Sequence, residues 1–187
     1  MLAYVFWHWK QASVPAPDYE AAQQAFHQAL KLAPSDGFIR SRSYGVAGYP
    51  WAANGGPGYE DWYLVPGSAG LDPLNQAAVT ASREVPHREA ARLVEGGTAG
   101  LYRLRMPESP LAAFAPTENH WFRKPAGLAY DHLWPLLGSI LEPSGSVLWI
   151  RHMTLGPAPE FCLQSPVPLE LPPPLSPLVT PLRQVWP

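Results

Sequence analysis

The sequence has little cysteine and no concentrated block of basic residues. Cys162 is the one cysteine among 187 residues, so an internal disulfide is excluded, and no Cys/His spacing typical of a zinc site is present. The formal net charge is -2. We therefore expect no nucleic-acid partner, because surfaces that follow phosphates are rich in Lys and Arg. A cytoplasmic protein is expected, since unpaired thiols are usual in that compartment.

Long apolar runs and phosphate-binding loops are also missing. No run approaches the roughly 20 apolar residues of a membrane-spanning helix, so no membrane partner is expected. The glycines at 55–58 are typical of a turn and Gly96-Gly97 of a helix end, so neither predicts a phosphate site. No Gly-x-Ser-x-Gly elbow is present and Cys162 has no histidine beside it, which disfavours a nucleophilic hydrolase.

Aromatic residues and prolines, in contrast, are abundant. The chain has eight tryptophans, eight tyrosines and 24 prolines, and the prolines concentrate after Pro157. Apolar residues make up 47% of the chain, enough to form a core at this length. Because large aromatic rings are costly to expose, some of them must face a pocket or a partner.

Hydrophobic patterns predict the order strand, helix, strand, strand, helix, strand over the first 106 residues. Strands are expected at residues 3–9, 38–46, 59–65 and 100–106. Helices are expected at residues 19–32 and 71–94. Asp18 is the expected N-cap of the first helix, and the second is expected to break near Pro86 and to end at Gly96-Gly97. This is the element order of a ferredoxin-like βαββαβ unit.

An internal repeat restarts this order after a connector at residues 107–117. Strands are expected at residues 118–124, 146–155, 160–165 and 183–186. A helix is expected at 130–141, and the proline-rich stretch 175–182 is expected to replace the second helix. In both units a Tyr-acidic pair starts the helix, a Pro-Ser pair ends it, and an arginine follows eight residues after that proline, Arg42 and Arg151. We expect a first repeat at 1–106 and a shortened second repeat with a proline-rich tail at 118–187.

The two units together resemble the dimeric α/β-barrel superfamily, in which ferredoxin-like domains pair through their sheets. The resemblance implies an α+β fold whose two repeats form a pseudo-dimer and enclose a barrel within one chain. A monomer is therefore expected rather than an obligate dimer. Members of the superfamily include cofactor-free monooxygenases, haem-dependent enzymes and isomerases, so the resemblance implies a site and not one particular reaction.

Polar side chains that the two repeats share indicate where a site between the sheets would lie. His8 or His120 would accept a proton near neutral pH. Arg42 and Arg151 would hold a carboxylate or enolate oxygen between aromatic walls. The candidate catalytic residues are His8, His120 and Asp61. The candidate ligand-binding residues are Arg42, Arg151, Lys10, Tyr63 and Trp149.

Each of these candidates also has a structural interpretation. The two arginines could be exposed or could pair with Asp61 and Glu60, and histidines near strand ends are often surface or core residues. His27 and His87 are placed on helices and are expected to be solvated. The tryptophans are expected to form a core between helices and sheet rather than a cage for a cofactor.

The leading hypothesis is a small-molecule site between the two sheets of a cofactor-independent oxygenase or isomerase. No cofactor is expected, and haem with His8 or His120 as its axial ligand is the alternative. The rival function is a non-enzymatic scaffold or binding module, in which tryptophan and leucine fill the space between the sheets. The proline-rich segment after Pro157 would then be a strap or a partner-binding segment. The volume between the sheets distinguishes the two hypotheses.

Overall fold

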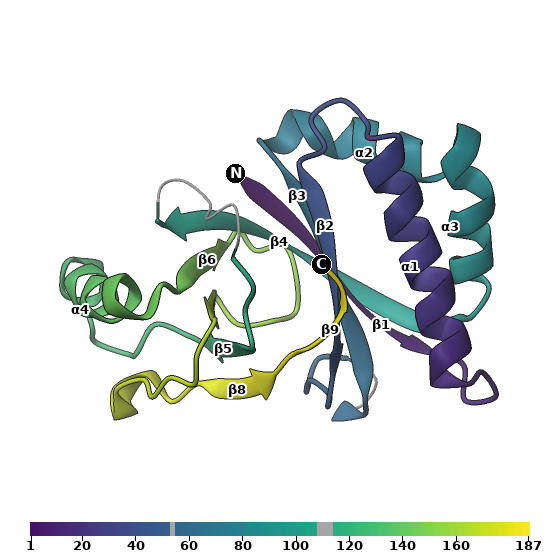
Figure 1. Ribbon diagram of the computed structural model, residues 1–187. Helices are drawn as coiled ribbons and strands as arrows, with labels where there is room; N and C mark the ends of the chain where they lie inside the picture. Colours follow the sequence, from purple (N-terminus) through teal and green to yellow (C-terminus); the bar gives the residue numbers. More distant parts are fainter. Residues whose placement is uncertain (53–54, 108–113) are drawn as a thin grey trace.

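A single nine-stranded antiparallel sheet runs through the part of the chain that the computed structural model describes, residues 1–52, 55–107 and 114–187. Its strand order is β8-β5-β7-β6-β4-β1-β3-β2-β9. Helices α1, α2 and α3 lie against the strands of the first half of the chain, and α4 lies against the strands of the second half (Figure 1). This arrangement confirms the expected α+β class. Among the described residues, none of the helices has the length and apolar character to cross a bilayer.

The first half of the chain follows the predicted element order. It contains β1 (Leu2–Lys10), α1 (Ala16–Leu32), β2 (Arg40–Val46), β3 (Gly58–Val65), α2 (Leu71–Ala78), α3 (Glu84–Ala91) and β4 (Val94–Met106). Its four strands lie in the order β4-β1-β3-β2. The second predicted helix is two helices separated by a 3₁₀ turn, Ala81–Arg83. Pro86 does not cause the break, because it lies in the first turn of α3, where a missing N–H is tolerated.

Two predicted helix ends are wrong. Asp18 does not cap α1, which starts at Ala16 after Pro15 and has Asp18 in its first turn. Gly96-Gly97 does not end a helix but belongs to β4, where Gly97 pairs with His8. A Cβ on Gly96 would lie 2.4 Å from the Trp9 ring, so these glycines allow rings of β1 to lie directly on β4.

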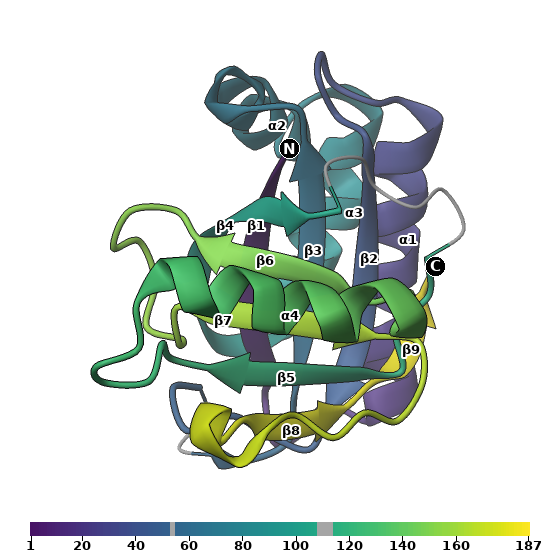
Figure 2. The same ribbon diagram turned by 90° about the vertical axis from the view of Figure 1, so that its left-hand side faces the viewer.

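The second half repeats the strand order of the first without its second helix. It contains β5 (Glu118–Phe122), α4 (Tyr130–Ser144), β6 (Val147–Arg151), β7 (Phe161–Ser165), β8 (Leu178–Pro181) and β9 (Arg183–Trp186). Its strands lie in the order β8-β5-β7-β6. Figure 2 shows α4 lying across β5, β6 and β7. The connector expected at 107–117 falls mainly on residues 108–113, which lie outside the described residues.

The C-terminal segment differs from the prediction. The stretch 175–182, expected to replace the second helix, instead contains β8 (178–181) beside β5, and a short 3₁₀ helix, Pro173–Leu175, precedes this strand. The strand predicted at 183–186 exists, but it pairs with β2 of the first half. Only Leu182 separates β8 from β9, and its N–H donates to the carbonyl of Thr117 at 2.8 Å. The two outermost strands in the sheet order, β8 and β9, are therefore joined through this single residue.

The alternation of side chains along each strand creates separate cores on the two faces of the sheet. Between the halves lies an aromatic core, made of Trp7, Tyr44, Tyr49, Trp62, Tyr102, Trp121 and Trp149. Its rings are in contact: the Trp7 and Trp121 centroids are 5.6 Å apart. On the outer faces, α1 covers the apolar core of the first half and α4 that of the second half.

Candidate small-molecule site

The predicted site residues lie on two opposite faces of the sheet. His8, Asp61 and Tyr63 face the helices of the first half. Arg42 and Trp149 face the space between the halves. The expectation that all the candidates line one space between two sheets is therefore wrong. The reason is the two-residue period of a strand, which turns neighbouring side chains to opposite faces.

Asp61 lies at the centre of a buried polar cluster beneath α1. Its Oδ2 accepts a hydrogen bond from the Tyr63 hydroxyl at 2.9 Å. The Nε2 atoms of His8 and His27 lie 3.2 Å and 3.4 Å from the same oxygen, and all three side chains are at most 1% exposed. The other ring nitrogen of each histidine meets a hydroxyl: Nδ1 of His8 is 2.5 Å from Tyr19, and Nδ1 of His27 is 2.7 Å from Ser41.

These contacts favour an ionised Asp61. Burial alone raises the pKa of its carboxyl group, but the facing imidazoles of His8 and His27 outweigh burial and hold that pKa well below its usual range. The Nε2 atoms of His8 and His27 lie within ion-pair distance of Oδ2 but do not have the geometry of a hydrogen bond to it. The second carboxylate oxygen, Oδ1, is buried and has no hydrogen-bond partner among the described residues.

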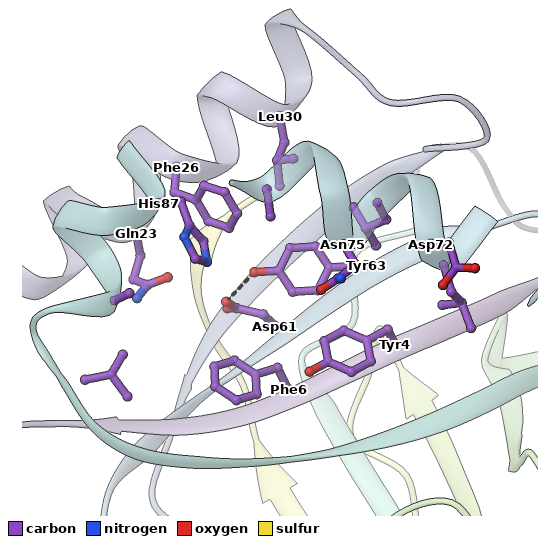
Figure 3. Close-up of a pocket in the computed structure, with 15 residues that line it drawn as sticks. Tyr4, Phe6, Gln23, Phe26, Leu30, Asp61, Tyr63, Asp72, Asn75 and His87 are labelled. Carbon is purple, nitrogen blue, oxygen red and sulfur yellow. Dashed lines mark hydrogen bonds between the residues drawn. The ribbon is translucent and has the colours of Figure 1, made fainter. Parts of the chain in front are cut away.

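A cavity of about 580 Å³ lies between the helices and the sheet of the first half, and Asp61 is one of its lining residues. Phe26 and His87 reach it from α1 and α3, and Phe6 reaches it from β1 (Figure 3). Leu30 adds an apolar wall from α1. The cavity therefore combines an apolar, partly aromatic lining with a buried carboxylate.

The charges that line this cavity are negative. Asp61 and Asp72 are its acidic lining residues, and no Lys or Arg of the described chain lines it. Burial lowers the pKa of His87, which keeps this imidazole uncharged near neutral pH. The anion-binding arginines expected in the site are thus absent from the cavity lining.

The space between the halves is largely filled. A crevice of about 20 Å³, lined by Arg42, Trp149 and Gln164 among others, remains there, and this volume suits about one water molecule. Arg42 lies over the ring of Phe114 at 5.7 Å. Arg151 instead donates from one guanidinium nitrogen to the carbonyls of Gly156 and Ala158, at 3.1 and 2.7 Å. The two arginines therefore do not point to one common anion site. Arg151 instead stabilises the loop that contains Gly156 and Ala158.

Glu60 is buried in the middle of the aromatic core, a position that the sequence did not indicate. It accepts hydrogen bonds from the Tyr49 hydroxyl at 2.6 Å, from Trp62 Nε1 at 2.9 Å and from Asn119 Nδ2 at 2.6 Å. Burial raises the pKa of Glu60, although these donors oppose the rise. Because Asn119 belongs to β5, this network joins the two halves.

The remaining candidates lie away from Asp61. His120 is fully buried in the second half, where its Nε2 lies 2.7 Å from Glu118. Lys10 lines a separate open hollow beside Arg183. His8 and His120 do not line the 580 Å³ cavity, so neither presents a ring nitrogen there as an axial ligand for haem. In the described part of the chain, no group of three His, Cys, Asp or Glu side chains is arranged to hold a metal ion.

Sequence reasoning missed the contribution of α1 to the cluster. His27 was expected to be solvated, yet it is fully buried. His87 is only partly exposed and lines the cavity. A signal was present, because Tyr19, Gln23, His27 and Leu30 recur at helical spacing and form one buried face of α1.

Comparisons with known proteins concern the fold. No family model and no curated protein sequence matches the chain. One similar solved structure is a protein provisionally assigned as a chlorite dismutase, with a TM-score of 0.52, 10% identity, and coverage of 99% of this chain and 96% of that chain. Another is an anthrone oxidase-like protein, with a TM-score of 0.51, 10% identity and coverage of 89% and 73%. At 10% identity this likeness shows a similar fold.

Proposed function

We propose that this protein binds a small molecule in the cavity between α1, α2, α3 and the first-half sheet. The observation that carries the proposal is a cavity of about 580 Å³ with a buried, ionised carboxylate in its lining. Ligand pockets commonly measure about 300–1,000 Å³ and combine apolar walls with a few convergent polar groups. Asp61 and His87 are such groups here, and Phe6, Phe26 and Leu30 are such walls.

Proton transfer to or from the bound molecule is the chemistry that we propose for this site. His87 lines the cavity, and its lowered pKa leaves the imidazole free to accept a proton near neutral pH. Behind Asp61, His8 and Tyr19 continue a chain of polar contacts away from the cavity. Such groups suit a cofactor-independent oxygenase or isomerase, and one structure of similar fold is described as anthrone oxidase-like.

Methyl NMR of the full-length protein tests binding in the cavity. A mixed library of small aromatic molecules would be added, and the methyl signals of Leu30, Leu74 and Val94, which line the cavity, would be followed. We expect selective shifts of these methyls. The methyls of Leu133 and Leu137, on the buried face of α4, serve as the internal control and are expected to stay unchanged. A Leu30→Trp variant, which places an indole ring in the cavity, is expected to abolish the shifts of the Leu74 and Val94 methyls.

Two outcomes of this experiment would contradict the proposal. The first is the absence of any ligand that shifts the cavity methyls. The second is binding that Leu30→Trp leaves intact, because the ligand would then lie elsewhere. An activity screen on the ligands found would follow, with His87→Gln expected to lower turnover by at least tenfold while binding persists.

A second candidate function is a non-enzymatic scaffold or binding module. It is favoured by the filled aromatic core between the halves, which leaves a crevice of about 20 Å³. In that case the aromatic residues have a structural role, and the helix-side cavity has no ligand. The same NMR experiment separates the two functions, since a scaffold predicts no shift of the cavity methyls.

We also propose that residues 1–106 and 118–187 are two ferredoxin-like repeats that form a pseudo-dimer within a monomer. The support is the equivalent strand order of the two halves, β4-β1-β3-β2 and β8-β5-β7-β6. The halves pair within the chain through β4 with β6 and through β2 with β9, so no second chain is needed to join them. Light scattering of the full-length protein is expected to give the mass of one chain. A stable dimer would contradict the monomer.

A further inference from the structure

We infer that the ligand of the helix-side cavity is an organic cation, a protonated amine carried on an aromatic body. Its ammonium group would contact Asp61, and its ring would lie among the aromatic side chains of the cavity. This inference rests on the proposed function, because it names the ligand class of the same site. It replaces the carboxylate or enolate ligand that the sequence predicted from the arginines.

The first support is the uneven use of the two oxygens of Asp61. The three groups that approach the carboxylate, Tyr63, His8 and His27, all approach Oδ2. Oδ1 is buried without a partner among the described residues. A buried carboxylate oxygen without a donor is costly, so it calls for a partner. An ammonium group in the cavity would supply that donor and a compensating charge.

The second support is the charge of the lining. Asp61 and Asp72 line the cavity, and no Lys or Arg of the described chain does so. The imidazoles of His8 and His27 contact Asp61 Oδ2, but neither residue lines the cavity. A carboxylate or phosphate ligand in the cavity would therefore meet the Asp61 carboxylate with no lysine or arginine in the lining to offset the repulsion, which is strong at low dielectric. The lining favours a cation over an anion of the same shape.

The third support is a continuous aromatic wall beside the carboxylate. Tyr4 and Phe6 stack with ring centroids 6.5 Å apart, and Tyr4 approaches Tyr63 at 6.1 Å. Phe26 lies on the helix side of the same cavity, 6.5 Å from Tyr63. Figure 3 shows these four rings around Asp61. Aromatic faces attract cations, and the attraction grows when water is excluded. An amine on an aromatic ring satisfies both the carboxylate and this wall.

A series of three matched probes tests the inference on the unmodified protein. Tryptamine, tryptophol and indole-3-propionate carry the same indole ring with an ammonium, a hydroxyl and a carboxylate group. Binding would be measured by calorimetry near neutral pH and low salt, and located by the Leu30 and Val94 methyl shifts. We expect tryptamine to bind at least tenfold more tightly than tryptophol, and indole-3-propionate not to bind measurably.

Variants then assign the preference to Asp61. Asp61→Asn is expected to weaken tryptamine binding at least tenfold and to change tryptophol binding by less than threefold. Asp72→Asn, at an exposed position of the lining, is the matched control and is expected to weaken tryptamine binding by less than threefold. If Asp61→Asn does not fold, the order of the three probes on the unmodified protein decides.

The outcomes separate this inference from the proposed function. Equal binding of the three probes, or tightest binding of indole-3-propionate, overturns the cation and leaves a small-molecule site. The same holds if none of the three binds while neutral library members still shift the cavity methyls. If neither the probes nor the library shift them, both the inference and the proposed function fail.

Discussion

The helix-covered faces of the two halves have the same strand order beneath them but differ in what they bury. In the first half, α1, α2 and α3 cover Asp61, His8 and His27, and a cavity of about 580 Å³ remains beside them. In the second half, α4 covers an apolar core in which Leu133 and Leu137 are fully buried. The second half keeps only a smaller polar contact, between the buried His120 and the partly exposed Glu118. What distinguishes the first half is a fully buried carboxylate that faces two histidines, with a cavity beside it.

This difference bears on function because buried charge is costly. Taking a carboxylate and two imidazoles out of water needs hydrogen-bond partners in return, which Tyr63, Tyr19 and Ser41 supply. Oδ1 of Asp61 and the Nε2 atoms of His8 and His27 remain without a hydrogen-bond partner among the described residues. Strongly perturbed titratable groups beside a cavity are enriched at functional sites. For this reason we propose the site in the first half of the chain.

The largest loss of unfolding free energy is expected from removing the charge of Asp61. Asp61→Asn leaves two imidazoles and the Tyr63 hydroxyl without their common ionised partner, and we expect a loss of about 3 kcal/mol of unfolding free energy. Glu118→Gln in the second half is the matched variant. The Glu118 side chain is 14% exposed and contacts His120, so water can replace part of the contact and about 1 kcal/mol is expected. Urea unfolding measures both, and equal losses would remove the distinction between the halves.

A smaller loss of unfolding free energy is expected from placing a larger side chain at a buried leucine of α1 or of α4. Leu30 in α1 and Leu137 in α4 are both fully buried, but only Leu30 lines the cavity. Leu137→Trp has no free space and should lose about 1–3 kcal/mol of unfolding free energy. Leu30→Trp should lose less than about 1 kcal/mol, because the added ring can occupy the cavity. If Leu30→Trp is as costly as Leu137→Trp, the cavity does not offer usable space.

The pH dependence of stability should separate the helix-covered face from the aromatic core. The pKa of Asp61 is lowered in the folded protein, so its contribution is present above its unfolded pKa of about 4 and is lost as pH falls below that value. The pKa of Glu60 is raised by burial, so its contribution is present below about pH 4 and is lost as pH rises through the folded pKa.

Two variants isolate these opposite trends. Asp61→Asn should reduce the loss of stability toward acid, whereas Glu60→Gln should reduce the loss toward higher pH. Urea midpoints from about pH 3 to about pH 8 would be compared for both variants and the unmodified protein. A Glu60→Gln variant whose profile matches that of the unmodified protein would show that Glu60 does not titrate differently in the folded state.

The smallest loss of unfolding free energy is expected from breaking the exposed ion pair that links β9 to α1. Arg183 of β9 pairs with Glu20 of α1, but the arginine side chain is 61% exposed. We expect Arg183→Ala to lose less than about 1 kcal/mol, because water competes with exposed ion pairs. Urea unfolding at low and high salt measures this. A loss above about 2 kcal/mol would show that this surface pair contributes far more than its exposure predicts.

The α+β class and most of the elements were predictable because they follow from local patterns. Alternation placed β1 and β3, and helical spacing placed α1 and α4. The predicted catalytic residues included His8 and Asp61, which the structure brings within 3.2 Å of each other. Their roles stay predictions. Arg42 and Arg151 were grouped with them because they occupy equivalent positions in the two repeats. The sequence does not distinguish an arginine that lines a cavity from one that contacts a ring or a loop carbonyl.

Local periodicity by itself therefore determined most of the strands and helices of this protein, with β8 and the start of β4 as exceptions, and which residues alternate along them. The tertiary structure decided which face of the sheet meets the helices, where the aromatic core leaves no room, and that His27 of α1 meets His8 of β1 at Asp61 of β3. The physical reason is the separation in sequence between the residues that set each feature. Periodicity is set by neighbours within one element, whereas a cavity and a shared carboxylate depend on segments that are distant in sequence and meet only in the packed chain.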